Sequence, residues 1–505
     1  MTRPFSVRPV PLVCCVLAGL LGASASARGQ LLPLSGRSGA SGSALVTQPA
    51  LPGATSSVNT VTPTIQVQGA LSGSRPSSTP LNGPLGLRAA VQQGLDYNLG
   101  HVSVSQAVQQ ARSQRTMARS ALLPTLMGDL SASVQQINLA AQGLDFGTSF
   151  GGFDIPSVVG PFHNIDLRAR VSQSVFDLSS LNTYRASRET QRATELSADD
   201  ARDLVVLAVG GTYLQAQAAR ARLEAARTQV ETANALFVQT GERRRAGLLA
   251  QVDVDRSHIQ ALTQQQRLAS VQNDLAKLKI NLLRMIGLGA TDQYELGEAV
   301  AFTPAPVVAL DEAIRQARES RADLKAAEAQ VRAAERALAA ARAERLPTVT
   351  VNADYGAIGK DPGSAERTYG VVGRLRMPLW DGGRTGAHVL QAEAVVAQRQ
   401  AERDDLSGQI EADVRKAFLD VAAAGRQVEL ARANVEVTQE AMALTRQRFE
   451  AGVGDSVEVM QAQEAVATAA YDVINSVFAH NLGKLNLARA MGQASAQYAA
   501  FLALP

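Results

Sequence analysis

Length and composition narrow the classes of protein that this chain can be. It has 505 residues, only 4% of them aromatic, and a formal net charge of +3. Such a length allows several ordinary domains or one very long one, and the scarcity of aromatic side chains favours long packed helices over thick cores. Arginine is common but alternates with aspartate and glutamate along the predicted helices. We therefore expect no nucleic-acid partner.

Residues 1–27 are typical of a secretory signal peptide. Arg3 and Arg8 form its positive region, Val10–Gly22 its apolar stretch, and residues 23–27 a small-residue cleavage site. Both cysteines of the chain lie inside this segment, so we expect an exported mature chain without cysteine. No later apolar run reaches the roughly 18 residues that a transmembrane helix needs.

Residues 28–84 differ in composition from the rest of the chain. They are rich in glycine, serine, threonine and proline, and their only charged side chains are three arginines. The segment has no sustained periodicity. We expect a disordered or extended linker.

The rest of the chain is an internal duplication. Residues 85–287 form a first copy and residues 310–492 a second, with 288–309 as the connecting segment and 493–505 as a C-terminal tail. Matching residues lie 205 positions apart over the later part of each copy: Tyr213 and Phe418, Gly247 and Gly452, Val254 and Val459, and Gly287 and Gly492. Nearer the start of each copy the spacing is 223, so the first copy has about 19 additional residues between its strands, which predicts a surface loop.

Each copy is predicted to contain the same elements in the same order. In the first copy these are a helix over Leu87–Leu122, a strand pair within residues 124–176, a long helix over Ser180–Arg245 and a shorter helix over Val252–Gly287. The first helix ends just before Pro124, as helices tend to do. The strand pair of the second copy lies within residues 347–380.

The strands are indicated by strict alternation of apolar and polar residues. In the second copy, Val349, Val351, Ala353 and Tyr355 alternate with threonine, asparagine and aspartate. A period of two over about ten residues is typical of a strand, and that length suits a tilted strand that crosses a membrane. A half-buried sheet in a soluble domain shows the same alternation, so the pattern by itself leaves both interpretations open.

Four strands in one chain leave two sheet edges open. Each unpaired backbone group in lipid costs several kcal/mol, and a small closed barrel needs about eight strands, so a membrane barrel would require at least two chains. Three chains would supply twelve strands and enclose a lumen. The alanine-rich helices can approach one another closely, as the wall of a helical tube requires.

These features together resemble the TolC family of outer-membrane efflux channels, also called outer membrane factors. The resemblance covers residues 85–492. It rests on the duplicated helix–strand–strand–helix–helix unit, the Leu-Pro pair before each first strand, the corner Met377–Arg384, and the Ala-Gly helix breaks followed by Val-Asp or Val-Glu. It implies an α+β homotrimer, with four strands per chain forming a twelve-stranded β-barrel in the outer membrane, continued by a long α-helical barrel in the periplasm.

The same resemblance implies a function and its partners. The chain would be the exit duct of a tripartite efflux or type I secretion system, passing substrates from an inner-membrane RND or ABC transporter to the exterior. A periplasmic adaptor, or membrane fusion protein, would join the two. Outer-membrane lipid would surround the barrel, and no enzymatic activity or cofactor is expected.

The helix breaks are the first candidate functional residues. Gly247 and Gly452 are predicted to be hairpin turns, where a left-handed residue without Cβ ends one helix. The resemblance implies that these turns lie at the periplasmic tip and that the adaptor docks over them. Gly454 departs from the family, because a basic residue that helps to latch the gate can stand at this place.

The resemblance also implies a gate just beyond the turns. Asp253 and Glu458, 205 positions apart, would line the periplasmic entrance. A carboxylate at a helix N-terminus also stabilises the helix by about 0.3–1 kcal/mol, so Asp253 could equally have a structural role. Because Gly454 cannot act as a latch, Arg448 or Phe449 is the candidate for that role.

The strand-to-helix corners and two enzyme-like motifs complete the candidates. We expect Asp177 and the group Asp381, Gly382 and Gly383 to form tight corners. The segment Asp381–Gly386 looks like a phosphate-binding loop but lacks the lysine of a P-loop. The motif Gly147–Gly151 has the G-x-S-x-G pattern of hydrolases, but it falls in the inserted loop rather than between a strand and a helix. The five histidines are isolated, which predicts no metal site.

Two other classes of protein are alternatives. A periplasmic coiled-coil adaptor would have a long helical hairpin, but it would also need a compact domain split around that hairpin. An extracellular coiled-coil structural protein would explain the alanine-rich helices but not the duplicated strand pairs. The sequence does not indicate the cargo, because a passive duct takes its specificity from its pump.

Overall fold

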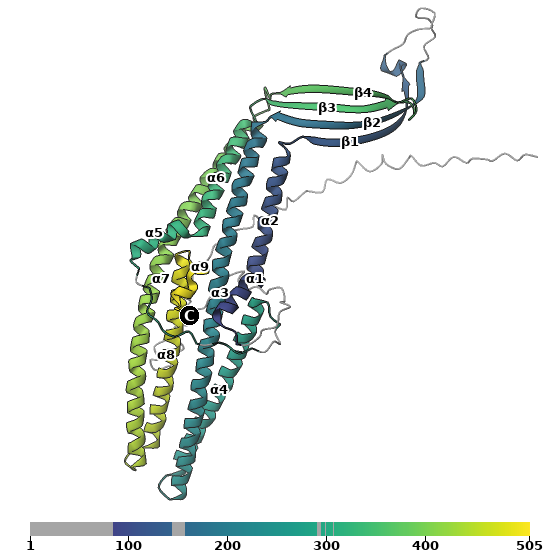
Figure 1. Ribbon diagram of the computed structural model, residues 1–505. Coiled ribbons are helices and arrows are strands. Elements are labelled where there is room, and N and C mark those ends of the chain that lie inside the picture. The colour runs from purple at the N-terminus through teal and green to yellow at the C-terminus, as the bar shows by residue number, and fades with distance from the viewer. Residues whose placement is uncertain (1–83, 144–156, 290–293, 298, 307, 505) are drawn as a thin grey trace, which may run out of the picture. The chain divides into compact units, whose positions relative to one another are not determined.

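The predicted duplication is visible in the order of the secondary-structure elements. The structure is a computed structural model that describes residues 84–143, 157–289, 294–297, 299–306 and 308–504. The first repeat contains α1 (Leu87–Tyr97), α2 (Leu99–Ser120), β1 (Thr125–Asn138), the 3-10 helix η1 (Ala140–Gln142), β2 (Val158–Phe176), α3 (Leu178–Arg245) and α4 (Gln251–Ile286). The second contains α5 (Leu310–Ser320), α6 (Ala322–Ala343), β3 (Thr348–Gly359), β4 (Glu366–Arg376), α7 (Arg384–Glu450) and α8 (Ser456–Ala490), and α9 (Ala494–Phe501) follows (Figure 1). The predicted signal peptide, the linker up to residue 83 and the Gly147–Gly151 motif lie outside the described residues.

The first predicted helix is two helices, and the prediction of one continuous helix over Leu87–Leu122 was wrong. The chain is extended at Asn98, between α1 and α2. The buried Asn98 side chain accepts a hydrogen bond from the backbone N–H of Gly100 at 2.9 Å and donates one to the backbone oxygen of Met285 at 3.2 Å. Asparagine is a favoured N-cap, and here it also anchors the break to α4.

The second repeat breaks at the equivalent position, 223 residues later. Arg321 stands between α5 and α6, with its side chain buried. Its guanidinium lies 2.6 Å from the Asp323 carboxylate and 3.3 Å from that of Asp413 on α7. The two breaks therefore share a position but use different partners, an amide in one repeat and a buried ion pair in the other.

The four strands form one antiparallel sheet in the order β1-β2-β3-β4. Its register places the predicted apolar series on one face, as the partners Leu130 and Leu167, Val171 and Ala353, and Tyr355 and Tyr369 show. The large side chains of that face are exposed, among them Leu126, Leu130, Tyr369 and Leu375. Within the described chain β1 and β4 each pair on one side only, so both sheet edges are open.

The opposite face of the sheet is polar and contains ion pairs between neighbouring strands. The Arg168 guanidinium lies 2.7 Å from the carboxylates of Asp166 and Asp354, and Arg170 lies 3.4 Å from Asp129. One face of the sheet is therefore apolar and the other charged. A strand with water on one side and lipid on the other requires this division.

The helices lie side by side, and α3 contacts six of the other described helices. It packs against α1, α2, α4, α6, α8 and α9, and α7 packs against α6 and α8. Near the hairpin turns the order of the helices is therefore α4, α3, α8, α7, with α4 and α7 on the two flanks (Figure 1). None of the described helices is both long and apolar enough to span a membrane.

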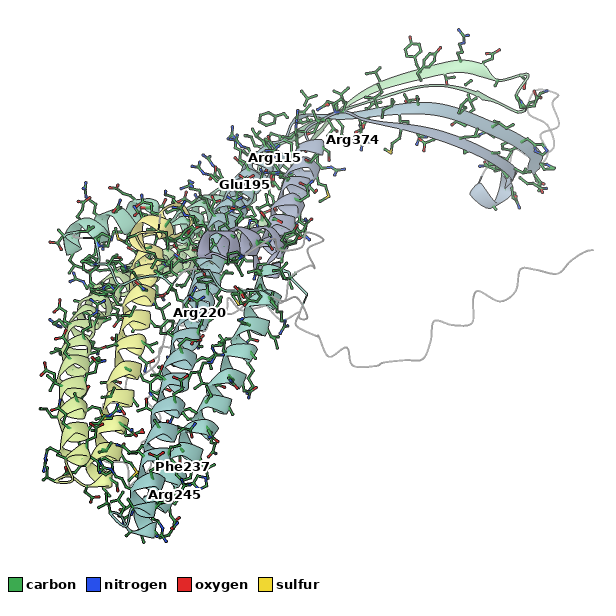
Figure 2. The ribbon with its side chains drawn as sticks, turned by 60° about the horizontal axis from the view of Figure 1, so that its bottom comes forward. Arg115, Glu195, Arg220, Phe237, Arg245 and Arg374 are labelled. Carbon is green, nitrogen blue, oxygen red and sulfur yellow. The ribbon has the colours of Figure 1, made fainter. Side chains whose placement is uncertain are left out.

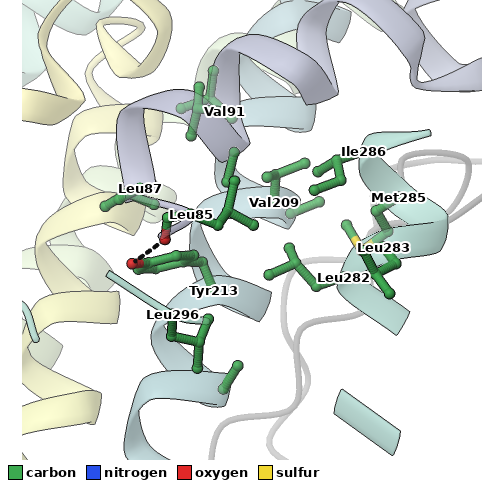
Figure 3. Packing of buried hydrophobic residues seen from close by; sticks show 14 of the residues in the cluster. Leu85, Leu87, Val91, Val209, Tyr213, Leu282, Leu283, Met285, Ile286 and Leu296 are labelled. Carbon is green, nitrogen blue, oxygen red and sulfur yellow. Dashed lines mark hydrogen bonds between the residues drawn. The ribbon is translucent and has the colours of Figure 1, made fainter. Parts of the chain in front are cut away.

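The largest hydrophobic cluster lies where α1, α3 and α4 meet. Val209, Leu282, Ile286 and Leu85 are buried there, and the Tyr213 hydroxyl donates a hydrogen bond to the backbone oxygen of Leu85 at 3.0 Å (Figure 3). Leu85 also forms a parallel bridge with Leu296 of the segment that connects the repeats. The start of the first repeat and the connecting segment are thus held by the same core.

Two equivalent lysines hold the connecting segment. Lys279 on α4 donates to the backbone oxygen of Tyr294 at 3.3 Å. Lys484 on α8, 205 residues later, is fully buried and donates to the backbone oxygen of Thr303 at 3.0 Å and to its hydroxyl at 2.7 Å. Burial lowers the pKa of Lys484 to about 8. Burial, together with the Lys484 charge, lowers the pKa of the neighbouring His480 to about 4.

The segment expected to be a C-terminal tail contains α9, which packs on the helices. Ala494, Phe501 and Leu502 are buried, and the backbone N–H of Ser495 donates to Asp203 of α3 at 2.7 Å. The sequence of α9 is short and weakly periodic, so its burial depends on the surface that α3 and α8 provide.

The buried Lys484 predicts a pH dependence of stability. The folded-state pKa of about 8 is below the unfolded value of about 10.4, so the charged lysine destabilises the fold at neutral pH. Stability should rise as the pH increases from about 8 towards 10, by up to about 3 kcal/mol for full titration. Thermal unfolding in detergent, followed by circular dichroism, should show this rise relative to Lys484→Met. The exposed Lys277→Met is the control and should behave like the wild type, and parallel profiles for all three proteins would contradict the assignment.

Candidate functional site

Two glycine turns close the two long helical hairpins. Gly247, between α3 and α4, has φ of 76°, and Gly452, between α7 and α8, has φ of 78°. In each turn the residue after the glycine donates its backbone N–H to the carbonyl five residues earlier, Leu248 to Arg243 at 2.9 Å and Val453 to Arg448 at 3.0 Å. This pattern is a Schellman motif, for which a left-handed glycine is favoured.

Gly454 is held close to the end of α7. Its backbone N–H donates to the Arg448 oxygen at 3.1 Å, and a Cβ on Gly454 would come within 2.9 Å of the backbone nitrogen of Phe449. A larger residue at this place would push the turn away from the helix. Glycine at position 454 therefore fits the close approach of this turn to the end of α7.

Phe449 joins the two hairpins through its ring and its carbonyl. The ring is 1% exposed and packs with Leu236 of α3 and Val459 of α8. Arg243, at the end of α3, places its guanidinium 4.3 Å from the centre of this ring. The same guanidinium donates to the backbone oxygen of Phe449 at 2.6 Å and to that of Glu450 at 3.1 Å.

These bonds satisfy carbonyls at the C-terminal end of α7. The last carbonyls of a helix have no partner within the helix and have partial negative charge, so a cation there is favourable. Arg243 thus combines a helix-end contact, two hydrogen bonds and a cation–π contact. We call Arg243 and Phe449 the clasp, because they connect the two hairpins.

The two predicted gate carboxylates have different surroundings. Asp253 accepts a hydrogen bond from the buried Ser456 hydroxyl at 3.2 Å, across the two hairpins, and lies 3.7 Å from Arg256 on its own helix. Glu458 lies 3.4 Å from Arg448, and both side chains are about half exposed. Asp253 is therefore part of the contact between hairpins, whereas Glu458 stays within its own hairpin at the surface.

Arg243 is the residue that sequence reasoning missed. It precedes Gly247 by four positions, as Arg448 precedes Gly452, so the two arginines are equivalent in the duplication. The 205-residue spacing of the duplication therefore pointed to Arg243 once Arg448 was a candidate. Arg243 crosses to the neighbouring hairpin and Arg448 does not, a difference that depends on tertiary packing. Figure 2 shows the end of α3 near Arg245, at the hairpin turn.

An aspartate side chain stands at each strand-to-helix corner. Asp177 caps α3 by accepting hydrogen bonds from the backbone N–H of Ser180 at 2.9 Å and from its hydroxyl at 2.6 Å. Asp381 accepts from the backbone N–H of Gly383 at 3.1 Å, and from the N–H and the hydroxyl of Thr385. These bonds, chiefly those with Thr385, lower the pKa of Asp381. Gly382 and Gly383 have positive φ, as a sharp corner requires.

The described residues contain no group of histidine, cysteine, aspartate or glutamate side chains that could hold a metal ion. The hairpin turns present exposed charged side chains, among them Arg448 and Glu458, and the clasp connects the two hairpins beside them. Such an arrangement can bind a protein or change shape.

Known proteins match both repeats of the chain. A family model described as outer membrane efflux protein matches residues 102–288 and 313–493. The outer membrane protein OprJ of Pseudomonas aeruginosa is 25% identical over 422 residues, which cover 80% of this chain and 84% of OprJ.

Solved structures share the fold. A membrane protein from Pseudomonas aeruginosa has a TM-score of 0.71 at 19% identity, covering 83% of this chain and 100% of its own. The CmeC outer membrane channel of Campylobacter jejuni has a TM-score of 0.71 at 14% identity, covering 89% and 95%.

These matches confirm the resemblance to TolC-like channels and the α+β, internally duplicated fold class. The two segments of the family match coincide with the two repeats, from α2 to the end of α4 and from α5 to the end of α8. The protein is located in the outer membrane of the cell. The chain belongs to the outer membrane efflux protein family.

Proposed function

We propose that the chain is the outer-membrane exit duct of a tripartite efflux or type I secretion system. Three copies would close a twelve-stranded barrel and a helical tunnel, and substrates would leave the cell through both. The observation that supports this proposal most strongly is that the open edges of the sheet coincide with the open flanks of the helices.

The two free sides of the chain differ from each other. On one side lie β1, α2 and α4, and on the other lie β4 and α7. A contact between unlike sides of successive copies is heterologous, and such contacts generate rings when the rotation closes. Ring closure would pair every edge strand, which removes the cost of unpaired backbone groups in lipid.

The helical flanks have apolar side chains that a neighbouring copy would cover. On α7, Leu430, Val437 and Leu444 are each more than 60% exposed and recur every seven residues. On α4, Val252 and Ile259 are exposed at the same spacing. Seven-residue spacing is typical of helices that pack as coiled coils. We therefore propose that α7 of one copy packs against α4 of the next.

The hairpin turns would form the periplasmic end of the duct. An adaptor would dock over Gly247, Gly452 and Gly454, where the chain reverses direction and the first two glycines are exposed. Asp253 and Glu458 would line the entrance, with Arg448 offsetting part of the charge of Glu458. The clasp of Arg243 and Phe449 would hold the two hairpins together in the closed entrance and separate on opening.

The other two classes of protein fit the fold less well. Neither a periplasmic adaptor nor an extracellular coiled-coil protein accounts for a four-stranded sheet with an exposed apolar face and two unpaired edges. No catalytic role is assigned to any residue. The inner-membrane transporter behind this duct would be of the RND or the ABC class.

Assembly through the α7 flank can be tested with one charge. Val437→Glu places a carboxylate in the proposed contact, where burial without a partner is unfavourable. Light scattering in detergent should show a trimer for the wild type and a much smaller trimer fraction for the variant. Gln439→Glu adds the same charge about 200° around the helix and should leave the trimer intact. Equal trimer fractions in both variants would refute the α7 contact, and a monomeric wild type would refute the duct.

The clasp can be tested by the conductance of the reconstituted protein. Arg243→Ala removes both hydrogen bonds to α7 and the cation–π contact, so the entrance should open more often and conductance in planar bilayers should increase severalfold. Arg243→Lys retains the charge but not the planar fork, and should be intermediate. The neighbouring, exposed Arg244→Ala removes the same charge and is the control. A wild-type conductance in Arg243→Ala, with the trimer retained, would show that the clasp does not hold the entrance closed.

A further inference from the structure

Two arginines on the polar face of the sheet have no ionic partner. Arg374 and Arg376 lie at the end of β4 that joins the helices, and both side chains are exposed. Figure 2 shows Arg374 at this end of the sheet. Within the described part of the chain neither arginine has an ion pair, whereas the two arginines of β2 on the same face are both paired.

The register shows why no carboxylate reaches them. Arg374 is opposite Thr350 and Arg376 is opposite Thr348. On the next strand, Ser174 is opposite Thr350 and Ser172 is opposite Asn352. At this end of the sheet the polar face therefore presents hydroxyl and amide groups, and its carboxylates lie farther along the strands.

Three carboxylates where the strands join the helices already have partners. Asp381, five residues after Arg376, accepts hydrogen bonds from Gly383 and Thr385 at the start of α7. Asp177 caps α3, and Glu344 lies 3.1 Å from the His388 ring. None of these carboxylates forms an ion pair with Arg374 or Arg376 among the described residues.

Closure of the barrel would not supply a partner either. In the proposed ring, β4 of one copy pairs with β1 of the next. The polar face of β1 begins with Thr125 and Met127, and its first carboxylate, Asp129, lies 3.4 Å from Arg170 of its own chain. The two arginines of each copy would therefore remain unpaired after assembly.

We propose that Arg374 and Arg376 form an anion-binding ring inside the duct, where the barrel lumen meets the helical tunnel. This inference rests on the proposed trimeric duct, in which polar faces line the lumen. Three copies would place six guanidinium groups in two layers, about 7 Å apart along the strands. Guanidinium binds carboxylate and phosphate groups through paired hydrogen bonds, so the ligand class is anions bearing these groups, as parts of a passing cargo or as free ions.

Selectivity in planar bilayers tests the ring. In neutral phosphatidylcholine bilayers under a gradient of potassium chloride, the reversal potential should show a chloride-to-potassium permeability ratio of about 3 or more at low salt, falling as salt screens the charges. Pyrophosphate added at millimolar concentration on the barrel side should reduce the current. Arg374→Gln combined with Arg376→Gln should lose most of both effects.

A matched arginine on the same strand is the control. Arg367 is exposed and its alternation places it on the opposite face of β4, so Arg367→Gln removes a charge without altering the lumen. Selectivity unchanged in the double variant, or shifted equally in Arg367→Gln, would overturn the ring. An effect present only in bilayers of anionic lipid would assign the arginines to lipid headgroups and also overturn it. Failure of the wild type to form any pore would instead refute the proposed duct, so the two failures are distinguishable.

Discussion

An unpaired strand edge in lipid is the constraint on which the rest of this fold depends. Backbone N–H and C=O groups at the edges of β1 and β4 have no water to bond to inside a membrane, so a four-stranded sheet cannot remain open there. The free flanks of the helices lie on the same two sides of the chain as the free sheet edges, because α4 continues the side of β1 and α7 continues the side of β4. Ring closure therefore pairs the edge strands and, in the same contact between copies, covers the exposed apolar side chains of α4 and α7.

Duplication supplied the two halves of the chain, but equivalent residues now have different roles. Arg243 reaches across to the carbonyl of Phe449, whereas its equivalent Arg448 pairs with Glu458 on its own hairpin. The lysines differ less, since Lys279 and Lys484 both donate to the segment that connects the repeats. Positions at the contact between hairpins have diverged because the two hairpins meet unlike neighbours, α3 touching α8 while α7 lies on a flank.

Most of the fold could be predicted from the sequence, because the repeat spacing, the alternating strands and the glycine turns are local or periodic signals. The breaks at Asn98 and Arg321 could not, since each depends on a partner far away in the chain, such as Met285 for Asn98. The clasp was missed for the same reason, because no local pattern shows that Arg243 meets a helix end 206 residues later. The exposed row of Leu430, Val437 and Leu444 on α7 could not be predicted either, because the sequence does not show which face of α7 packs against α6 and α8.

The distribution of charge on the sheet follows from its division into one face toward water and one face toward lipid. An arginine on the lipid face costs about 2–4 kcal/mol at the middle of a bilayer but little near its surface. Arg367, on the apolar side, accordingly stands one residue from the start of β4, whereas Arg168 and Arg170 lie within β2 on the polar side, where carboxylates neutralise them. Arg374 and Arg376 are also on the polar side but have no such partner. Unpaired cations can remain at that place because water hydrates them, so their lack of an ionic partner costs little stability.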